Sequence, residues 1–281
     1  NMHISLDSEL GQQRRLNQVG ETITSIAAPA AAYSLRSLTG GDPLAVRVRR
    51  DTSGGAGDDD EQDFTVSQIN SGALVDFVGS GNDGFVSTWY DQSGNGKHAT
   101  QGADSKEPKI VDSGSLISGG LEFDLASFST LLIPSSIYSN LNSLSSFLVC
   151  KAKAVTAFNI ALGLNPSASI GVWQGYHILD ELALLYNNTN TVTLGSVDAN
   201  THLHGLTFGS TNSRAFFDGT LISTFSSANV SVSASTFSIG SVGDSFGHWD
   251  STIEELIIYD SDQFSNSTKL QANIKNYYSI S

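Results

Sequence analysis

The chain has 281 residues, of which 39% are hydrophobic and 15% are charged, and its formal net charge at pH 7 is −14. This apolar share can build a sizeable core, which excludes an intrinsically disordered chain. Nucleic acids and anionic membranes are bound by clustered positive charge, so we expect neither as a partner. No run of 18 or more apolar residues occurs, so we expect no membrane insertion.

The single cysteine, Cys150, lies within the apolar run 147–150. It cannot form an intrachain disulfide, and a reactive thiol needs an open, electropositive setting that these neighbours do not offer. The sequence therefore predicts a buried thiol and a fold held together by packing.

Residues 1–30 differ in composition from the rest of the chain. Residues 12–16 could form a helical turn or two, and residues 27–30 are typical of a linker. We interpret 1–30 as a short helical or extended leader, which serves either as a plain lead-in or as a tether to a larger assembly. Residues 31–281 are then the folded domain.

From Ala32 onward the pattern favours short strands and turns over helices. Apolar and polar residues alternate over 33–36 and 45–49, as they do in half-buried strands. A loop is predicted over 54–60, a short helix over 71–78, a strand over 85–90 and a turn over 91–96. Further strands are predicted over 146–150, 157–162, 182–186, 191–197, 202–208, 214–217, 221–225, 236–240 and 253–259.

Two local signals in the second half are sharper than the rest. Asp218-Gly219 separates two apolar runs, which predicts a tight β-hairpin. Leu270, Ile274 and Tyr277 or Tyr278 recur at helical spacing, which predicts one amphipathic helix near the C-terminus. The whole pattern indicates an all-β sandwich or jelly roll with one C-terminal helix.

The stretch Thr88-Trp89-Tyr90-Asp91-Gln92-Ser93-Gly94-Asn95-Gly96-Lys97-His98-Ala99-Thr100-Gln101 resembles a motif of the arabinofuranosidase B catalytic domain. It also resembles concanavalin-like modules of phage and bacterial surface proteins. Residues 32–36, 46–50 and 61–63 are similar to the same modules, and 253–259 and 274–278 are similar to the ends of laminin-G-like domains. The resemblance runs from about Ala32 to the C-terminus and implies a concanavalin-like two-sheet jelly roll.

The enzyme and the surface modules suggest different functions. The arabinofuranosidase domain bears disulfides, whereas this chain has one cysteine, and its nucleophile and acid match no positions here. The phage and surface modules are the closer likeness, and they imply virion decoration, tail or head appendages, or adhesion.

Asp91 could be a catalytic carboxylate or a metal ligand. It also opens a turn in which an Asp side chain accepts hydrogen bonds from backbone N–H groups, and we favour that structural role.

A glycosidase needs two carboxylates at a defined separation. Glu254 and Glu255 are neighbours on a predicted strand, so they should face opposite sides of the sheet. The candidates for such a pair are Asp91, Glu122, Asp180, Glu181, Glu254 and Glu255.

Acidic residues gather in one predicted loop, where oxygen ligands would suit Ca²⁺, the one cofactor we consider. A solvated loop is the simpler interpretation. The weak metal candidates are Asp58, Asp59, Asp60 and Asp63. His202 and His204 share a strand face but lack a third ligand.

Two aromatic stretches with Gly and polar neighbours are candidate sugar-binding loops, although core packing is the ordinary role of such rings. The glycan-binding candidates are Trp173, Tyr176, His177, Asp180, His248 and Trp249.

We therefore expect a structural or attachment module on a bacteriophage virion. Its expected partners are other virion or surface proteins, which would contact residues 1–30, and a host-surface glycan. The expected location is the virion surface or the extracellular space. The alternatives are a glycoside hydrolase of the arabinofuranosidase type and a free extracellular lectin. We expect no catalytic residue unless the hydrolase alternative holds.

Overall fold

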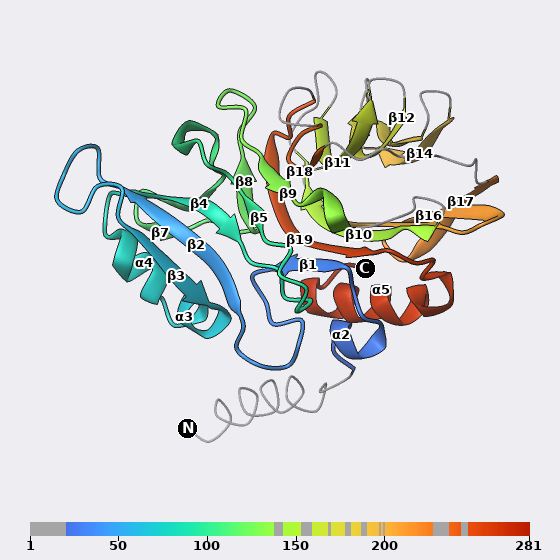
Figure 1. The fold of residues 1–281 in the computed structure, drawn as a ribbon, viewed down its shortest axis with the longest axis horizontal. Coiled ribbons are helices and arrows are strands. Elements are labelled where there is room, and N and C mark those ends of the chain that lie inside the picture. Colours follow the sequence, from blue (N-terminus) through green and yellow to red (C-terminus); the bar gives the residue numbers. More distant parts are fainter. Residues whose placement is uncertain are drawn as a thin grey trace, which may run out of the picture.

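The computed structural model describes residues 21–137, 143–152, 159–167, 170–177, 181–186, 190–196, 198, 200–226, 236–242 and 247–281. For residues 164–167, 170–173, 176–177, 181–186, 190–196 and 236 it describes the backbone alone. The described residues form the predicted all-β antiparallel sandwich with one C-terminal helix (Figure 1). None of the helices in these ranges has the length and apolar character needed to cross a bilayer.

One layer of the sandwich is an antiparallel ladder in the order β1-β19-β10-β15-β16-β17 (Figure 1). The strands are β1 (Ala31–Ser34), β19 (Ser251–Tyr259), β10 (Ser145–Lys151), β15 (Thr201–Phe208), β16 (Asn212–Phe217) and β17 (Thr220–Ser226). The first and last strands of the domain are therefore neighbours.

The facing layer has the order β9-β18-β11-β12-β13-β14. Its strands are β9 (Leu131–Ile133), β18 (Thr236–Ile239), β11 (Asn159–Ser167), β12 (Ile170–His177), β13 (Glu181–Tyr186) and β14 (Asn190–Ser196). Buried side chains of both layers, such as Leu148, Leu162 and Phe237, belong to one continuous hydrophobic core.

A third ladder runs β3-β2-β4-β6-β8 and joins β19 through β8. Its strands are β3 (Glu61–Thr65), β2 (Leu44–Asp51), β4 (Asp83–Trp89), β6 (Lys109–Asp112) and β8 (Leu121–Phe123). The short strand β5 (Ala99–Thr100) links β4 to β9, and β7 (Ser115–Leu116) pairs with β6. Helices α3 (Val66–Asn70) and α4 (Ala73–Val78) join the core through Ile69, Leu74 and Val78.

A second core lies between the β1-β19-β10-β15 sheet and two helices, α2 (Ile23–Ile26) and α5 (Phe264–Tyr278). Leu270 and Ile274 of α5 pack with Ile23 of α2, as helical spacing predicted for the first two. The helix begins at Phe264, ahead of the apolar positions that predicted it. Residues 21–30 of the predicted leader or tether thus pack on the domain, and its remaining residues, 1–20, lie outside the described residues.

The predicted Asp218-Gly219 hairpin is confirmed. Both residues have positive φ, 49° and 82°, and they connect the paired residues Phe217 and Thr220. This is the backbone that a two-residue turn needs to match the twist of its strands. The Asp218 carboxylate also accepts a hydrogen bond from the Leu203 backbone N–H at 2.9 Å.

Residues 170–177 form a strand, although their glycines suggested a loop. A Cβ added at Gly175 would collide with the backbone of Asn159 and Ile160 on the neighbouring strand β11. The glycine therefore permits close approach of two backbones within the sheet, which is a common reason for glycine in a strand.

The turn that follows β4 fastens β1 through side chains. Asp91 Oδ1 accepts from the backbone N–H of Ala32 at 2.9 Å and of Ser93 at 2.8 Å, and its Oδ2 accepts from that of Lys97 at 2.9 Å. The structural role predicted for Asp91 is confirmed.

Gln92 continues the same pattern along the chain. Its Nε2 donates to the carbonyl oxygens of Ser34 and Arg36 at 2.9 and 3.0 Å, and its Oε1 accepts from the Leu38 N–H at 2.9 Å. Asn95 donates to the carbonyl oxygen of Pro29 at 3.0 Å. These side chains thus satisfy backbone groups of β1 and of the segments that precede and follow it.

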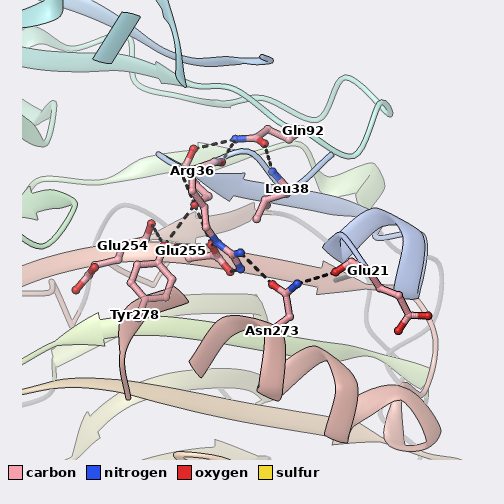
Figure 2. A network of polar contacts seen from close by, with 9 residues as sticks. Glu21, Arg36, Leu38, Gln92, Glu254, Glu255, Asn273 and Tyr278 are labelled. Atoms are coloured by element: carbon pink, nitrogen blue, oxygen red, sulfur yellow. Dashed lines mark hydrogen bonds and ion pairs between the residues drawn. The ribbon is translucent and has the colours of Figure 1, made fainter. Parts of the chain in front are cut away.

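The segment held in this way carries Arg36 into a buried ion pair (Figure 2). Arg36 Nε donates to Glu255 Oε2 at 2.7 Å and Nη2 donates to Glu255 Oε1 at 2.9 Å, while Nη1 reaches Asn273 of α5 at 2.9 Å. Ser34 and Tyr278 donate to the same carboxylate. Arg36 and Glu255 are 9% and 0% exposed, so the ion pair at the centre of this network is shielded from water.

Replacing Asp91 with alanine is expected to lower the free energy of unfolding by about 3 kcal/mol, because several backbone donors lose their acceptor at a buried site. Urea unfolding of the Asp91→Ala variant measures this. Asp76→Ala, an exposed carboxylate on α4, is the control and should change stability by less than about 0.5 kcal/mol. Equal effects of the two substitutions would contradict the assignment.

Replacing Arg36 with methionine should destabilise the protein by about 3–5 kcal/mol, because it leaves the Glu255 charge buried without its partner. The double variant Arg36→Met/Glu255→Met removes both charges and should recover much of that loss. Urea unfolding of the wild type, of Arg36→Met, of Glu255→Met and of the double variant gives the coupling free energy between the two residues. Additive losses in the double variant would show that the ion pair is not the source of the effect.

Candidate functional site

An open pocket of about 510 Å³ lies over the third ladder. Its residues come from strands β2, β4, β6 and β8 and from the segments around 104–107, 124–129 and 250. The lining residues are Arg49, Asp51, Phe85, Asp104, Ser105, Glu107, Lys109, Glu122, Phe123, Asp124, Ser127, Ser129 and Asp250.

Strand register explains how the floor of this pocket is assembled. Arg49 is paired with Phe85, Phe85 with Lys109, and Lys109 with Glu122, across β2, β4, β6 and β8. Residues directly opposite each other in an antiparallel pair project from the same face. The neighbouring residues Val48, Val86 and Ile110 face the core instead. One row of four side chains, distant in sequence, therefore lies on the outer face.

Both cationic residues of the row are held by carboxylates. Arg49 Nε lies 2.8 Å from Glu107 Oε2, and Arg49 Nη1 lies 2.9 Å from Asp59 Oδ1. Lys109 Nζ lies 2.8 Å from Asp83 and 3.2 Å from Asp112. Burial raises the pKa of Glu107, against the opposing effect of Arg49.

The Phe85 ring occupies the centre of the row. The Arg49 guanidinium carbon lies 5.1 Å from its centroid and Lys109 Nζ lies 5.6 Å from it. These cation–π contacts fix both long side chains beside the ring. Phe85 itself is partly exposed, so an aromatic surface remains at the pocket floor.

Sequence reasoning included Glu122 among carboxylate candidates but missed the rest of the pocket. One signal was available: Phe85 occupies the outward position of an alternating strand whose inward positions include Val86. An aromatic residue at an outward position is not needed for the core, which is a sign of a binding surface.

The predicted sugar-binding aromatics do not gather in this pocket. Trp173, Tyr176 and His177 lie on β12, where their side chains are outside the described atoms, and Asp180 lies outside the described residues. Their role remains a prediction.

His248 and Trp249 are buried, 5% and 1% exposed, where exposed loop positions were expected. Trp249 belongs to the main core, and its Nε1 donates to the Thr252 carbonyl oxygen at 3.4 Å. A ring this buried presents no face to a sugar, so for these two residues the expectation is wrong in this conformation. Phe128 packs edge-on against His248.

The predicted Ca²⁺ ligands face other partners. Asp58 accepts from the Thr52 and Gly54 backbone N–H groups, and Asp59 and Asp60 pair with Arg49 and Arg50. Asp63 pairs with Arg47 at 3.0 Å and accepts a hydrogen bond from the Tyr90 hydroxyl at 2.7 Å. Within the described part of the chain no group of three or more His, Cys, Asp or Glu residues is arranged to hold a metal ion. These four residues, which the sequence offered only as weak Ca²⁺ candidates beside the favoured interpretation of a solvated loop, are thus held by arginines and turn amides.

Glu254 and Glu255 do not face opposite sides of the sheet. The register shifts here, since Val149 pairs with Glu255 and Cys150 with Ile253, which makes Glu254 the extra residue of a β-bulge. Ile253 and Leu256 both enter the main core, so the two carboxylates between them share the α5 face. Glu254 there accepts from Thr201 at 2.8 Å, and burial raises its pKa, with the Glu255 charge adding to the rise.

The predicted buried thiol is confirmed, because Cys150 is fully buried beside His204. Burial raises the pKa of Cys150 and lowers that of His204 to about 3, so both are neutral and unreactive.

His202 lies on the same strand as His204 but is hydrogen-bonded to two carboxylates, Asp218 at 2.7 Å and Asp198 at 2.9 Å, and its ring stacks on Phe217. The hydrogen bond with Asp218 is the largest cause of a raised His202 pKa, and Asp198 adds to it.

No protein-family model matches the chain, and no curated protein matches it by sequence. Solved structures do resemble its fold. An arabinofuranosidase complexed with arabinofuranosyl-α-1,2-xylobiose superposes with a TM-score of 0.63 at 13% identity, covering 89% of this chain and 63% of that one. A GH54 α-L-arabinofuranosidase soaked with a cyclic sulfate inhibitor gives 0.61 at 13% identity, with the same coverage.

A sialidase from Trypanosoma rangeli gives a TM-score of 0.50 at 15% identity, covering 67% of this chain and 31% of that one. The present chain thus spans less than two thirds of the length of each of these proteins. At this level of identity the comparisons establish a shared fold, in agreement with the resemblance to the arabinofuranosidase domain.

His202 should stabilise the fold more at low pH than at high pH. Its pKa is raised on folding, so its contribution is complete below the ordinary value of about 6.5 and is lost as pH rises through the folded value. Urea unfolding of wild type and His202→Gln at about pH 5.5 and about pH 8.5 measures the difference. The difference in free energy of unfolding between wild type and His202→Gln should be larger at the lower pH. An equal difference at both pH values would contradict the stabilising ion pair.

Proposed function

We propose that this chain is a glycan-binding module of a virion or cell-surface assembly, and that the pocket over β2, β4, β6 and β8 is its sugar site. The observation that carries the proposal is the pocket itself. Its volume of about 510 Å³ lies within the usual range for small-ligand sites. Phe85 offers a ring for apolar sugar faces, and surrounding carboxylates and serines offer acceptors and donors for hydroxyl groups.

The fold gives secondary support. Two proteins of similar fold are arabinofuranosidases, one of them complexed with a sugar, and a third is a sialidase. All three act in carbohydrate chemistry, which makes a sugar a reasonable ligand for a pocket on this scaffold. Because function does not follow from fold, the pocket residues must carry the test.

Placement on a virion or cell surface rests on the likeness of the stretch Thr88–Gln101 to phage and bacterial surface modules. Residues 1–30 would supply the attachment to neighbouring proteins. Co-sedimentation of the native chain with assembled particles tests this placement. Recovery of the chain as a free cytoplasmic monomer would reject it.

Hydrolysis is the second candidate, and it is favoured by the several carboxylates that share the pocket. Glu107 is buried and has a raised pKa, whereas Glu122 is exposed. Contrasting environments of this kind separate an acid from a nucleophile or base in glycosidases. The Arg49 ion pair stabilises the charged form of Glu107 and argues against the acid role, so binding without cleavage is the preferred proposal.

Phe85→Ala should weaken glycan binding about tenfold or more, because truncating a central aromatic anchor typically costs over 1 kcal/mol. A glycan array identifies the ligand, and titration calorimetry compares the variant with wild type. Phe264→Ala is the matched control, since Phe264 is a partly exposed ring on α5 that does not line the pocket. Equal binding by wild type and Phe85→Ala would place the sugar site elsewhere.

Reducing-sugar release in the same array wells separates the two functions. Binding without release supports the recognition module. Release that disappears in Glu122→Gln would establish the hydrolase instead.

A further inference from the structure

The pocket lining carries more negative than positive charge. Six carboxylate residues and two cationic residues contribute to it. The carboxylates are Asp51, Asp104, Glu107, Glu122, Asp124 and Asp250. Asp104, Glu122 and Asp124 are exposed, so their charge acts directly on an incoming ligand.

The two cations do not offset this excess toward a ligand. Arg49 is 9% exposed in its side chain and engages Glu107 and Asp59, and Lys109 engages Asp83 and Asp112. Asp59, Asp83 and Asp112 lie outside the lining, so the two cations are turned partly away from the cavity toward these partners. An anionic ligand would have to break existing ion pairs to obtain a cationic partner of its own.

We propose that this pocket selects its glycan by charge, accepting neutral or amine-bearing sugars and rejecting sugars that carry carboxylate or sulfate groups. This inference rests on the proposed function and adds the class of ligand. Like charges brought together at a binding site act as a repulsive element, which is an effective source of specificity. The exposed pair Glu122 and Asp124 supplies that element here.

The test uses three hexasaccharides that share a β-1,4-linked pyranose backbone and differ in charge. One is built of glucose units (neutral), one of glucosamine units (amine-bearing) and one of glucuronic acid units (acidic). They are measured alongside the general glycan array. We expect the acidic hexamer to bind at least about tenfold more weakly than the neutral one, and the amine-bearing hexamer to bind at least as well. An acidic glycan as the tightest ligand, on the array or in this series, would overturn the inference while leaving glycan binding intact. Absence of binding to any glycan would reject both.

Charge variants show whether the lining causes the selectivity. The double variant Glu122→Gln/Asp124→Asn should reduce the gap in binding affinity between the neutral and the acidic hexamer severalfold. Asp76→Asn, which removes an exposed carboxylate on α4, should leave that gap in affinity unchanged. Raising the salt from about 0.05 to about 0.5 M should narrow the gap in wild type as well, because salt screens exposed charges. A gap that persists in the double variant and in high salt would assign the selectivity to shape rather than charge.

Discussion

The fold depends on a strand edge that is satisfied by side chains. β1 has β19 on one side, and on the other side Asp91 and Gln92 bond to the backbone groups that a further strand would otherwise take. Gln92 also bonds to the backbone of Arg36, whose side chain pairs with Glu255. The contacts along this strand edge and the buried ion pair therefore depend on each other. Asp91 and Gln92 of the stretch 88–101 are therefore accounted for by these structural contacts, without a part in any reaction.

The candidate site is built on a different principle. Its floor is a cross-strand row on the outward face, in which each side chain is placed by register and not by neighbours in sequence. Because sheets hold register firmly where one face is buried, the Val48 and Val86 core contacts indirectly fix the positions of Arg49 and Phe85. Ligand contacts on such a rigid floor require little ordering upon binding.

Local sequence signals predicted the elements whose causes are local. The Asp218-Gly219 turn, the Asp91 turn and the Leu270–Ile274 stripe each depend on residues a few positions apart, and each was found in the structure. The pocket was not predictable in this way, because Arg49, Phe85 and Glu122 meet only when the four strands β2, β4, β6 and β8 pair. The bulge at Glu254 likewise depends on how β19 meets β10, and the burial of Trp249 depends on the core that surrounds it.

The side-by-side arrangement of β1 and β19 also has a consequence for modular evolution. The backbone carbonyl oxygen of Glu21 accepts from Asn273 at 2.7 Å, so the two ends of the described domain leave from the same region. A unit with adjacent entry and exit points can be spliced into a surface loop of a host protein, since it closes the loop without stretching it. The Asn273–Glu21 hydrogen bond therefore holds the start of the described chain against the C-terminal helix α5.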